Sequence, residues 1–326
     1  MSAETAALLV NLGSPAEPSA AAVRRFLREF LSDPHVITLP APLRKLLLEF
    51  VILPRSAEKT AVRYAKIRTP AGMPLVVETE KLRSRVAECL GGGVPVFAAM
   101  RYGAPSLADA AKAIAAAGTR CVFVIPLYPQ QAESTRDTAV ERAAEIFGKV
   151  APQIRLSFAE PFFAAPGYIA AIAGSVRRAL AGKEFDKLVI SFHGVPTATP
   201  GAARYREQCS VTAELLGAEL ALPRERYETV FQSKFGRGNW LGPDARERFR
   251  ALSAEGARRI AVVAPGFVAD CIETLEELAI SGKRLFLDAG GSEFFYVPCL
   301  NDDVAFASFL SEGIRENLRG FGGAAA

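Results

Sequence analysis

The chain has 326 residues, enough for one large domain or two ordinary domains with separate hydrophobic cores. Half of the residues are hydrophobic and 23% are charged, a balance typical of globular proteins and not of disordered or fibrous ones. The net charge is only +4, and the sequence has neither an arginine-rich tract nor a stacked aromatic motif, so we expect no nucleic-acid partner. A mild positive charge suits an anionic small molecule or an anionic membrane surface.

The termini and the cysteines indicate where the protein works. The first residues lack the basic leader and the long apolar core of a signal peptide, and no run of about 18 apolar residues is present to span a membrane. The 5 cysteines are scattered singly without a CxxC pair, which argues against a disulfide framework and against a thiolate-only metal site. We therefore expect a cytoplasmic protein.

Short apolar runs along the chain predict buried β-strands, several of which end abruptly at Gly or Pro. They are Ala7–Pro15, Val94–Met100, Cys121–Pro129, Ile154–Phe158, Leu188–Pro196, Tyr227–Gln232, Ile260–Phe267 and Phe294–Val297. Helical patterns alternate with them at Ser19–Leu31, Glu78–Leu90, Leu107–Ala117, Thr135–Val150, Gly167–Leu180, Ala203–Leu216, Asp244–Glu255, Asp270–Ser281 and Asp303–Leu318. Such alternation predicts parallel sheets with right-handed crossovers.

The same pattern occurs in both halves of the chain. We therefore predict an α/β protein of two similar Rossmann-like lobes, each with a four-stranded parallel sheet flanked by helices. Residues 1–160 would form the first lobe, with the helix 303–320 packing back on it, and residues 161–302 the second.

The segment Leu39–Arg68, here called the apolar segment, does not fit the alternation. It combines many large apolar side chains with Arg44, Lys45, Arg55 and Lys59. It is too apolar for a solvated helix and too short to span a bilayer. An interfacial helix or the hydrophobic lip of a ligand cleft would explain it, and the alternative is a helix whose second face is covered by the other lobe.

His193 ends the apolar run Leu188–Ile190, just before Gly194 and Pro196 turn the chain. In open α/β sheets, ligands bind at the carboxyl ends of the strands. An imidazole at this edge is able to ligate a metal or to move a proton near neutral pH. The alternative is a strand-end histidine that is simply hydrogen-bonded to a neighbouring loop.

An acidic helix is predicted after the strand at Ile260. Asp270, Glu273 and Glu277 are spaced three and four apart, which places them on one face of an α-helix. A line of carboxylates of this kind would carry a hydrated cation or protons. The structural alternative is that Asp270 and Glu273 form a capping box.

His193 and Glu273 follow the first and third strands of the second lobe, so both would face one cleft. One imidazole and one carboxylate would bind a divalent metal weakly and exchangeably.

Three further residues would line a binding site. The only tryptophan, Trp240, lies in the Gly-rich stretch FQSKFGRGNWLGP and would lie flat against an aromatic ligand, or it is a core or hinge residue. Arg101 and Tyr102 follow a predicted strand, and Arg101 would meet a ligand carboxylate unless it is an ordinary surface residue. The loop NLGSP has no phosphate-loop signature, and we assign His35 no role.

Taken together, these stretches resemble the ferrochelatases, which insert ferrous iron into a porphyrin to make haem. The matching segments lie in order over nearly the whole chain: LLVNLGSP, FLSDPHVITLP, AMRYGAPSL, PLYPQQAEST, SFHGVP, FQSKFGRGNWLGP and PGFVADCIETLEEL. The resemblance implies two Rossmann-like lobes with a porphyrin cleft between them.

The resemblance also implies roles for single residues. His193 and Glu273 match the family's active-site pair, which would serve both catalysis and metal binding. The porphyrin-binding positions would be Arg101, Tyr102, Trp240 and Arg55, and the proton or metal path would use Asp270 and Glu277. Within the apolar segment, Leu39–Leu53 matches the lip that guides the macrocycle and that, in membrane-associated members, contacts the bilayer.

This sequence departs from the family in three places. Cys271 stands where many members carry a second histidine, although bacterial relatives also have cysteine there. Ala202-Ala203-Arg204-Tyr205 replaces the family's Gly-Asp-Pro-Tyr, which puts the role of that loop in doubt. The chain has no C-terminal cysteine cluster, and Ala132 replaces the cysteine of cluster-bearing members, so we expect no iron–sulfur cluster and no permanently bound cofactor.

We therefore predict a ferrochelatase, a metal-inserting lyase that acts on protoporphyrin IX and ferrous iron in the last step of haem synthesis. The alternatives are a coproporphyrin III ferrochelatase, a cobalt chelatase and, from another class, a haem- or metallophore-binding protein without turnover. The apolar segment favours protoporphyrin and allows peripheral contact with the inner membrane. The sequence leaves the oligomeric state open.

Overall fold

The computed structural model describes residues 4–235 and 238–322. The chain forms two compact units. The first comprises Met1–Leu127, Glu133–Glu160 and Asp302–Ala326, and the second comprises Tyr128–Ala132 and Pro161–Asn301.

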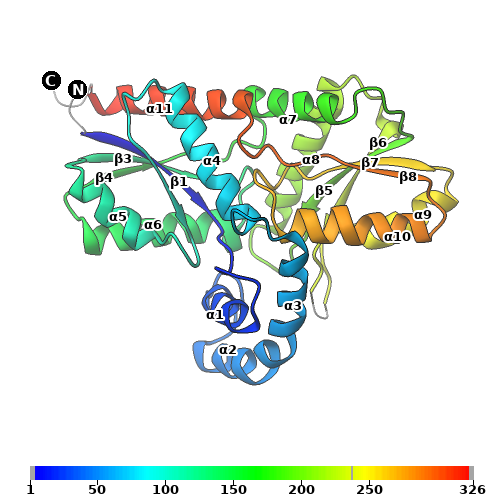
Figure 1. Ribbon diagram of the computed structural model, residues 1–326, viewed down its shortest axis with the longest axis horizontal. Helices are drawn as coiled ribbons and strands as arrows, with labels where there is room; N and C mark the ends of the chain where they lie inside the picture. Colours follow the sequence, from blue (N-terminus) through cyan, green and yellow to red (C-terminus); the bar gives the residue numbers. More distant parts are fainter. Residues whose placement is uncertain (1–3, 236–237, 323–326) are drawn as a thin grey trace. The chain divides into compact units, whose positions relative to one another are not determined.

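The first unit is built on a parallel sheet with the strand order β2-β1-β3-β4 (Figure 1). Its strands are β1 (Thr5–Asn11), β2 (Val96–Met100), β3 (Cys121–Pro126) and β4 (Arg155–Phe158). β1 is central, with Ala7 opposite both Val96 and Phe123, and its apolar residues are buried as expected for a strand covered on both faces. The helices are α1 (Ala20–Leu31), α2 (Ala41–Leu47), the π-helix η1 (Leu48–Ile52), α3 (Leu53–Ile67), α4 (Pro74–Cys89), α5 (Leu107–Ala116), the π-helix η2 (Glu133–Asp137), α6 (Thr138–Val150) and α11 (Val304–Gly322).

The second unit repeats this plan with the strand order β6-β5-β7-β8 (Figure 1). Its strands are β5 (Lys187–His193), β6 (Tyr227–Gln232), β7 (Arg259–Val263) and β8 (Glu293–Tyr296). The helices are α7 (Pro166–Ala179), α8 (Ala202–Glu219), the 3₁₀-helix η3 (Arg224–Arg226), α9 (Ala245–Ala254), the π-helix η4 (Ile272–Gly282) and α10 (Lys283–Asp288). All pairings are parallel, which confirms the predicted α/β class with two similar four-stranded sheets.

The C-terminal helix α11 belongs to the first unit. It packs on α4, where Arg315 donates to the Cys89 carbonyl at 2.5 Å, and its Asn317 accepts a hydrogen bond from Ser157 of β4 at 2.7 Å. The division of the chain into domains at residues 160 and 302 stays a prediction.

The segment Tyr128–Ala132 joins the second unit although β3 and η2, on either side of it, belong to the first. Gln130 Nε2 donates to Thr212 Oγ1 at 3.0 Å, and the Gln131 amide donates to Gln208 Oε1 at 2.7 Å. These hydrogen bonds attach the segment to α8 of the second unit. The pattern of apolar residues in the sequence cannot indicate such polar attachments.

The helical regions match the sequence prediction only in part. The apolar segment is helical from α2 through η1 to α3, as the prediction allowed, whereas α4 begins at Pro74 and not at Glu78, since proline suits a first helical turn. The helix α10 was not predicted. The acidic helix η4 is a π-helix that begins at Ile272, so Asp270 precedes it.

Gly217 on α8 provides a test of how closely this helix packs on the second sheet. A Cβ at this position would lie 2.6 Å from the Tyr227 ring, whereas a Cβ at Gly148 on α6 would meet nothing within 4 Å. We expect Gly217→Ala to lower the free energy of unfolding by about 1–3 kcal/mol through overpacking. The matched Gly148→Ala should raise it by roughly 0.5–1 kcal/mol, because alanine favours helix. Urea unfolding measures both, and equal effects would contradict this account of the packing.

Candidate functional site

His193 is the last residue of β5, at the carboxyl edge of the second sheet. Its backbone is held firmly, since it pairs in register with Gln232 of β6 and its carbonyl accepts a hydrogen bond from Tyr205 Oη at 2.9 Å. Its ring Nδ1 lies 2.6 Å from the Gly194 carbonyl oxygen. Because a carbonyl oxygen only accepts, this bond places the proton on Nδ1 and leaves a lone pair on Nε2.

Gly194 allows Trp240 to approach this strand end. A Cβ at Gly194 would lie 2.9 Å from the Gln232 carbonyl oxygen and 3.4 Å from Trp240 Cε3. The backbone of Trp240 forms an isolated antiparallel β-bridge with Pro196, and the residue is half-buried. The structure therefore places the indole next to the residue that follows His193. Gly236 and Arg237, from the same loop, lie outside the described residues.

The π-helix η4 carries the predicted carboxylates Glu273 and Glu277. A π-helix has i→i+5 hydrogen bonds, so one turn takes between about four and five residues, and side chains four apart lie nearly above one another. Gln232 Nε2 donates to the Glu273 carbonyl at 2.8 Å, and Gln232 Oε1 accepts from Ser191 Oγ at 2.7 Å. The side chain of Gln232 thus connects η4 to β5, the strand that ends at His193.

Glu277 is a largely buried carboxyl group with two hydrogen bonds from one residue. Ser233 donates its amide to Oε1 at 2.7 Å and its hydroxyl to Oε2 at 2.8 Å. Burial raises the pKa of Glu277, and the nearby charge of Glu273 adds to this effect. The hydrogen bonds from Ser233 and the electrostatic attraction of His193 oppose the rise, which shows that these groups sense one another.

Asp270 precedes η4, so the single α-helical face predicted to carry all three carboxylates is not formed, and the place of Asp270 in a proton or metal path stays a prediction. Its carboxylate accepts from Tyr296 Oη at 2.6 Å, from Asn301 Nδ2 at 2.8 Å and from Thr274 Oγ1 at 3.1 Å. The predicted capping box of Asp270 with Glu273 is also wrong. The N-cap is Cys271, whose amide donates to Thr274 Oγ1 at 2.9 Å.

Cys271 is buried, and this determines the protonation state of its thiol. Burial raises the pKa of the thiol well above its ordinary value, and the charge of Glu273 raises it further. The group is therefore a neutral thiol at neutral pH, and a neutral thiol is a poor metal ligand.

In the first unit, Arg101 and Tyr102 follow β2 and converge on a buried carboxylate. Asp33 Oδ2 accepts from Arg101, from Tyr102 Oη at 2.7 Å and from Thr138 Oγ1 at 2.6 Å. Burial alone would raise the pKa of Asp33, but the hydrogen bonds from Thr138, Tyr102 and the His35 amide, together with Arg101, hold it below its ordinary value. Tyr102 is fully buried, so its side chain supports Arg101 and is not exposed to contact a ligand.

The apolar segment exposes several large side chains. Phe50 is 73% exposed, Leu43 55% and Leu46 54%, and α2 buries none of its residues. Arg55 is an exposed cation of the same segment, with one hydrogen bond to the Val51 carbonyl at 3.3 Å. Behind this surface, a buried apolar cluster and the Arg28–Glu49 ion pair hold the segment to α1.

A pocket of about 440 Å³ lies at the carboxyl end of β1. Its walls come from α1, from the start of α4 and from the chain after β2, and they are mainly apolar. Arg25 contributes a cation, and Glu29 contributes a carboxylate that accepts from the Gly103 amide at 3.0 Å. The size suits part of a small organic ligand. The sequence analysis did not identify Arg25.

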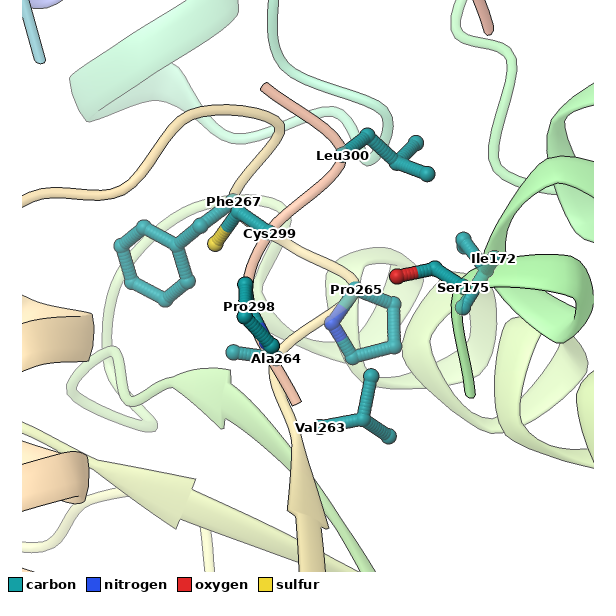
Figure 2. A pocket seen from close by; sticks show the side chains of 9 residues that line it. All are labelled: Ile172, Ser175, Val263, Ala264, Pro265, Phe267, Pro298, Cys299 and Leu300. Atoms are coloured by element: carbon teal, nitrogen blue, oxygen red, sulfur yellow. The ribbon is translucent and has the colours of Figure 1, made fainter. Parts of the chain in front are cut away.

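A second pocket lies beside the carboxyl end of β7 in the second unit (Figure 2). Ile172 and Ser175 from α7 form one side, and Pro265, Phe267 and Cys299 form the other. It has space for about one water molecule, so it is too small for a macrocycle. The ring centroid of Phe267, which lines this pocket, is 6.4 Å from that of His193.

A family model described as Ferrochelatase matches residues 4–318. The chain belongs to the ferrochelatase family. A ferrochelatase of Aromatoleum aromaticum is 42% identical over 320 residues, covering 96% of this chain and 88% of that protein. One from Pseudomonas putida is 40% identical over 332 residues, covering 94% and 97%. The resemblance seen in the sequence is confirmed.

Solved structures of other chelatases show the same fold. SirB from Bacillus subtilis, solved with Fe³⁺, has a TM-score of 0.57 at 12% identity, covering 96% of this chain and 95% of that one. CbiX, the terminal enzyme of siroheme biosynthesis in denitrifying bacteria, has a TM-score of 0.53 at 16% identity, covering 95% and 98%.

Two absences apply to the described part of this ferrochelatase-family chain. No group of three or more His, Cys, Asp and Glu side chains that would hold a metal ion occurs in residues 4–235 and 238–322. Over the same residues, no helix has the length and the apolar character needed to cross a membrane. The expected absence of an iron–sulfur cluster stays a prediction.

Sequence reasoning missed the residues that hold the predicted ones in place, above all Gln232, Ser233 and Asp33. A usable signal existed for the first two, because Gln232 is a polar residue at the end of a buried strand, as His193 is, and Ser233 follows it directly. For Asp33 there was none, since nothing in the order of residues links it to β2.

Replacing Asp33 tests the buried network of the first unit. We expect Asp33→Asn to lower the free energy of unfolding by about 3 kcal/mol at neutral pH, because Arg101 loses its charged partner. The pKa of Asp33 is lower in the folded state than its ordinary value of 3.8. The ionised carboxylate therefore stabilises the fold above pH 3.8, and this stabilisation is lost as the pH falls through the folded-state pKa.

Urea unfolding at about pH 7 and about pH 3 measures the difference in the free energy of unfolding between the wild type and Asp33→Asn, and this difference should be smaller at the lower pH. Glu160→Gln, at a side chain that is 92% exposed, is the control and should change stability by less than about 0.5 kcal/mol. A loss of the same size at both pH values would contradict the linkage.

Proposed function

We propose that this ferrochelatase-family chain inserts ferrous iron into protoporphyrin IX in the last step of haem biosynthesis. Family membership identifies a metal-inserting lyase with iron and a porphyrin as its substrates. The observation that carries the residue assignment is the open Nε2 of His193 at the same sheet edge as the two glutamates of η4.

His193 is proposed as the base. A porphyrin carries two pyrrole protons that must leave before a metal enters, and a general base has to lie within hydrogen-bond reach of them. The Gly194 carbonyl holds the proton on Nδ1, which leaves Nε2 free to accept one. Glu277 interacts electrostatically with His193, so it would stabilise the imidazolium that forms.

Glu273 and Glu277 are proposed to handle the cation and the released protons. Carboxylate oxygens suit a hydrated divalent ion, and one imidazole with one carboxylate holds it weakly enough for transfer. Glu273 is half-buried near His193's strand, so these two residues would hold the metal together. Asp270 is fully engaged in its own hydrogen bonds, and we assign it the support of the η4 N-terminus.

Three residues are proposed to contact the porphyrin. Trp240 offers an aromatic face beside Gly194, and a bent macrocycle would stack on it. Arg101, with Nη1 left over after its bonds to Asp33 and Thr138, would meet a porphyrin carboxylate, and Tyr102 would keep it in position. Arg25 offers a second cation in its pocket.

The apolar segment is proposed to guide the macrocycle and to rest on the cytoplasmic face of the inner membrane. Exposed Leu43, Leu46 and Phe50 lie among Lys45 and Arg55, and apolar side chains mixed with cations suit an anionic lipid surface. A poorly soluble, largely apolar substrate such as protoporphyrin would reach the site from there. We place the protein in the cytoplasm with peripheral membrane contact.

Anaerobic ferrous insertion into protoporphyrin IX and coproporphyrin III, followed by porphyrin absorbance, tests the activity. We expect protoporphyrin turnover in the wild type and a loss of about 100-fold or more in His193→Ala, as for removal of a general base. His35→Ala is the matched control and should retain activity. A preference for coproporphyrin III would contradict the assignment of protoporphyrin IX as the substrate. Tight haem retention without turnover would favour the binding-protein alternative.

Co-sedimentation with anionic lipid vesicles tests the membrane contact. Phe50→Ser removes a large exposed side chain, and we expect it to weaken partition about tenfold, since burying a phenylalanine contributes roughly 1.5–3 kcal/mol. Val304→Ser, at another exposed apolar residue on α11, should leave partition unchanged. Equal losses in both variants, or no binding by the wild type, would contradict the proposal.

A further inference from the structure

Arg101 is a partly buried cation whose hydrogen bonds are unevenly distributed over its guanidinium group. The side chain is 12% exposed, and the Tyr102 ring covers one face of the guanidinium, whose Cζ lies 4.3 Å from the ring centroid. Nε and Nη2 donate to Thr138 Oγ1 at 3.0 and 2.8 Å, and Nη2 also donates to Asp33 Oδ2. These bonds leave the two N–H donors of Nη1.

The nitrogen Nη1 is open to a ligand. Within residues 4–235 and 238–322, no hydrogen bond or ion pair involves it, and it is not among the buried side-chain atoms that lack a partner, so it reaches solvent. A guanidinium that is fixed at Nε and Nη2 presents the donors of Nη1 in a set direction. A carboxylate is the natural acceptor for them.

Thr138 lies at the centre of this arrangement. It is the first residue of α6 and is 2% exposed. The pKa of Asp33 is lowered, so its carboxyl group is ionised at neutral pH and only accepts hydrogen bonds. The hydroxyl of Thr138 therefore commits its single hydrogen to Asp33 Oδ2, at 2.6 Å, and both lone pairs of Oγ1 are left for Arg101.

The three residues come from different elements, namely the end of α1, the exit of β2 and the start of α6. Asp33 is also fixed independently, since its Oδ1 accepts from the His35 amide at 2.8 Å. Thr138 is bonded to both charged groups but carries no charge itself. Removing its hydroxyl would leave the ion pair between Arg101 and Asp33 in place and would remove the two bonds that fix the rotation of the guanidinium.

We propose that Thr138 is a positioning residue whose hydroxyl orients Arg101, so that Nη1 receives a carboxylate of the porphyrin. An arginine that is already ordered loses less conformational entropy when the carboxylate binds. This assignment rests on the proposed function, because it concerns how the same chain recognises its porphyrin.

Porphyrin titration of the metal-free protein tests the proposal without turnover. The probes are protoporphyrin IX and its dimethyl ester, which lacks ionised carboxylates, each followed by porphyrin fluorescence with the full chain. Thr138→Val replaces the hydroxyl with a methyl group of similar size. We expect it to weaken protoporphyrin binding about tenfold, because hydrogen bonds to a charged group are lost, and to leave binding of the ester unchanged. In the enzyme assay, the KM for porphyrin should rise by a similar factor while the KM for ferrous iron stays the same.

Two further variants separate positioning from folding. Thr138→Ser keeps the hydroxyl and should restore most of the affinity for protoporphyrin. Thr119→Val is the matched control, because it removes another buried hydroxyl of the first unit, one that has no hydrogen-bond partner in the described part of the chain. It should leave the binding of both probes unchanged.

An Arg101→Met background decides the route of the effect. There, Thr138→Val should weaken protoporphyrin binding no further, because the cation that Thr138 orients is already gone. Unchanged affinity in Thr138→Val, an equal loss for the dimethyl ester, or a further loss in the Arg101→Met background would overturn the proposal. Absence of turnover with this pattern of binding intact would overturn the proposed function alone, and no porphyrin binding by the wild type would overturn both.

Discussion

The side-chain amide of Gln232 is the connection on which the site of the second unit depends. It is buried between β5 and η4, accepts from Ser191 and donates to the Glu273 carbonyl. A buried amide that lost either partner would incur a desolvation cost comparable to a whole hydrogen bond, so strand and helix hold their spacing. The imidazole and the carboxylates, which come from parts of the chain about eighty residues apart, keep a fixed relation through this group.

Both units use the carboxyl edge of their sheet in a similar way. In the second, His193 ends β5 and Ser233 follows β6; in the first, Arg101 follows β2 and meets the buried Asp33. Arg101 is held by the carboxylate of Asp33, and the backbone at His193 is held by the phenol of Tyr205. The two sheets also have equivalent strand orders, so under the proposed function one architecture would supply a base and carboxylates in one unit and a cation in the other.

The strands were predictable because they are nearly continuous apolar runs that end at Gly or Pro, and the position of His193 followed directly from them. The π-helical form of η4 was not predictable, since i→i+5 bonding leaves no mark on composition, and it moved Asp270 off the expected face. The burial of Tyr102 was not predictable either, because only the folded chain brings Asp33 within hydrogen-bond distance of its hydroxyl group. Exposure of the apolar segment was correctly suggested by its excess of leucine without a matching polar face.

The state of the cysteines bears on survival beside a redox-active substrate. Ferrous iron and oxygen together generate oxidants, and these attack thiolates far faster than thiols. Burial raises the pKa of both Cys271 and Cys209, so each sulfur stays protonated and shielded. Cys271, the N-cap of the acidic helix, therefore lacks the thiolate form that oxidants attack most rapidly.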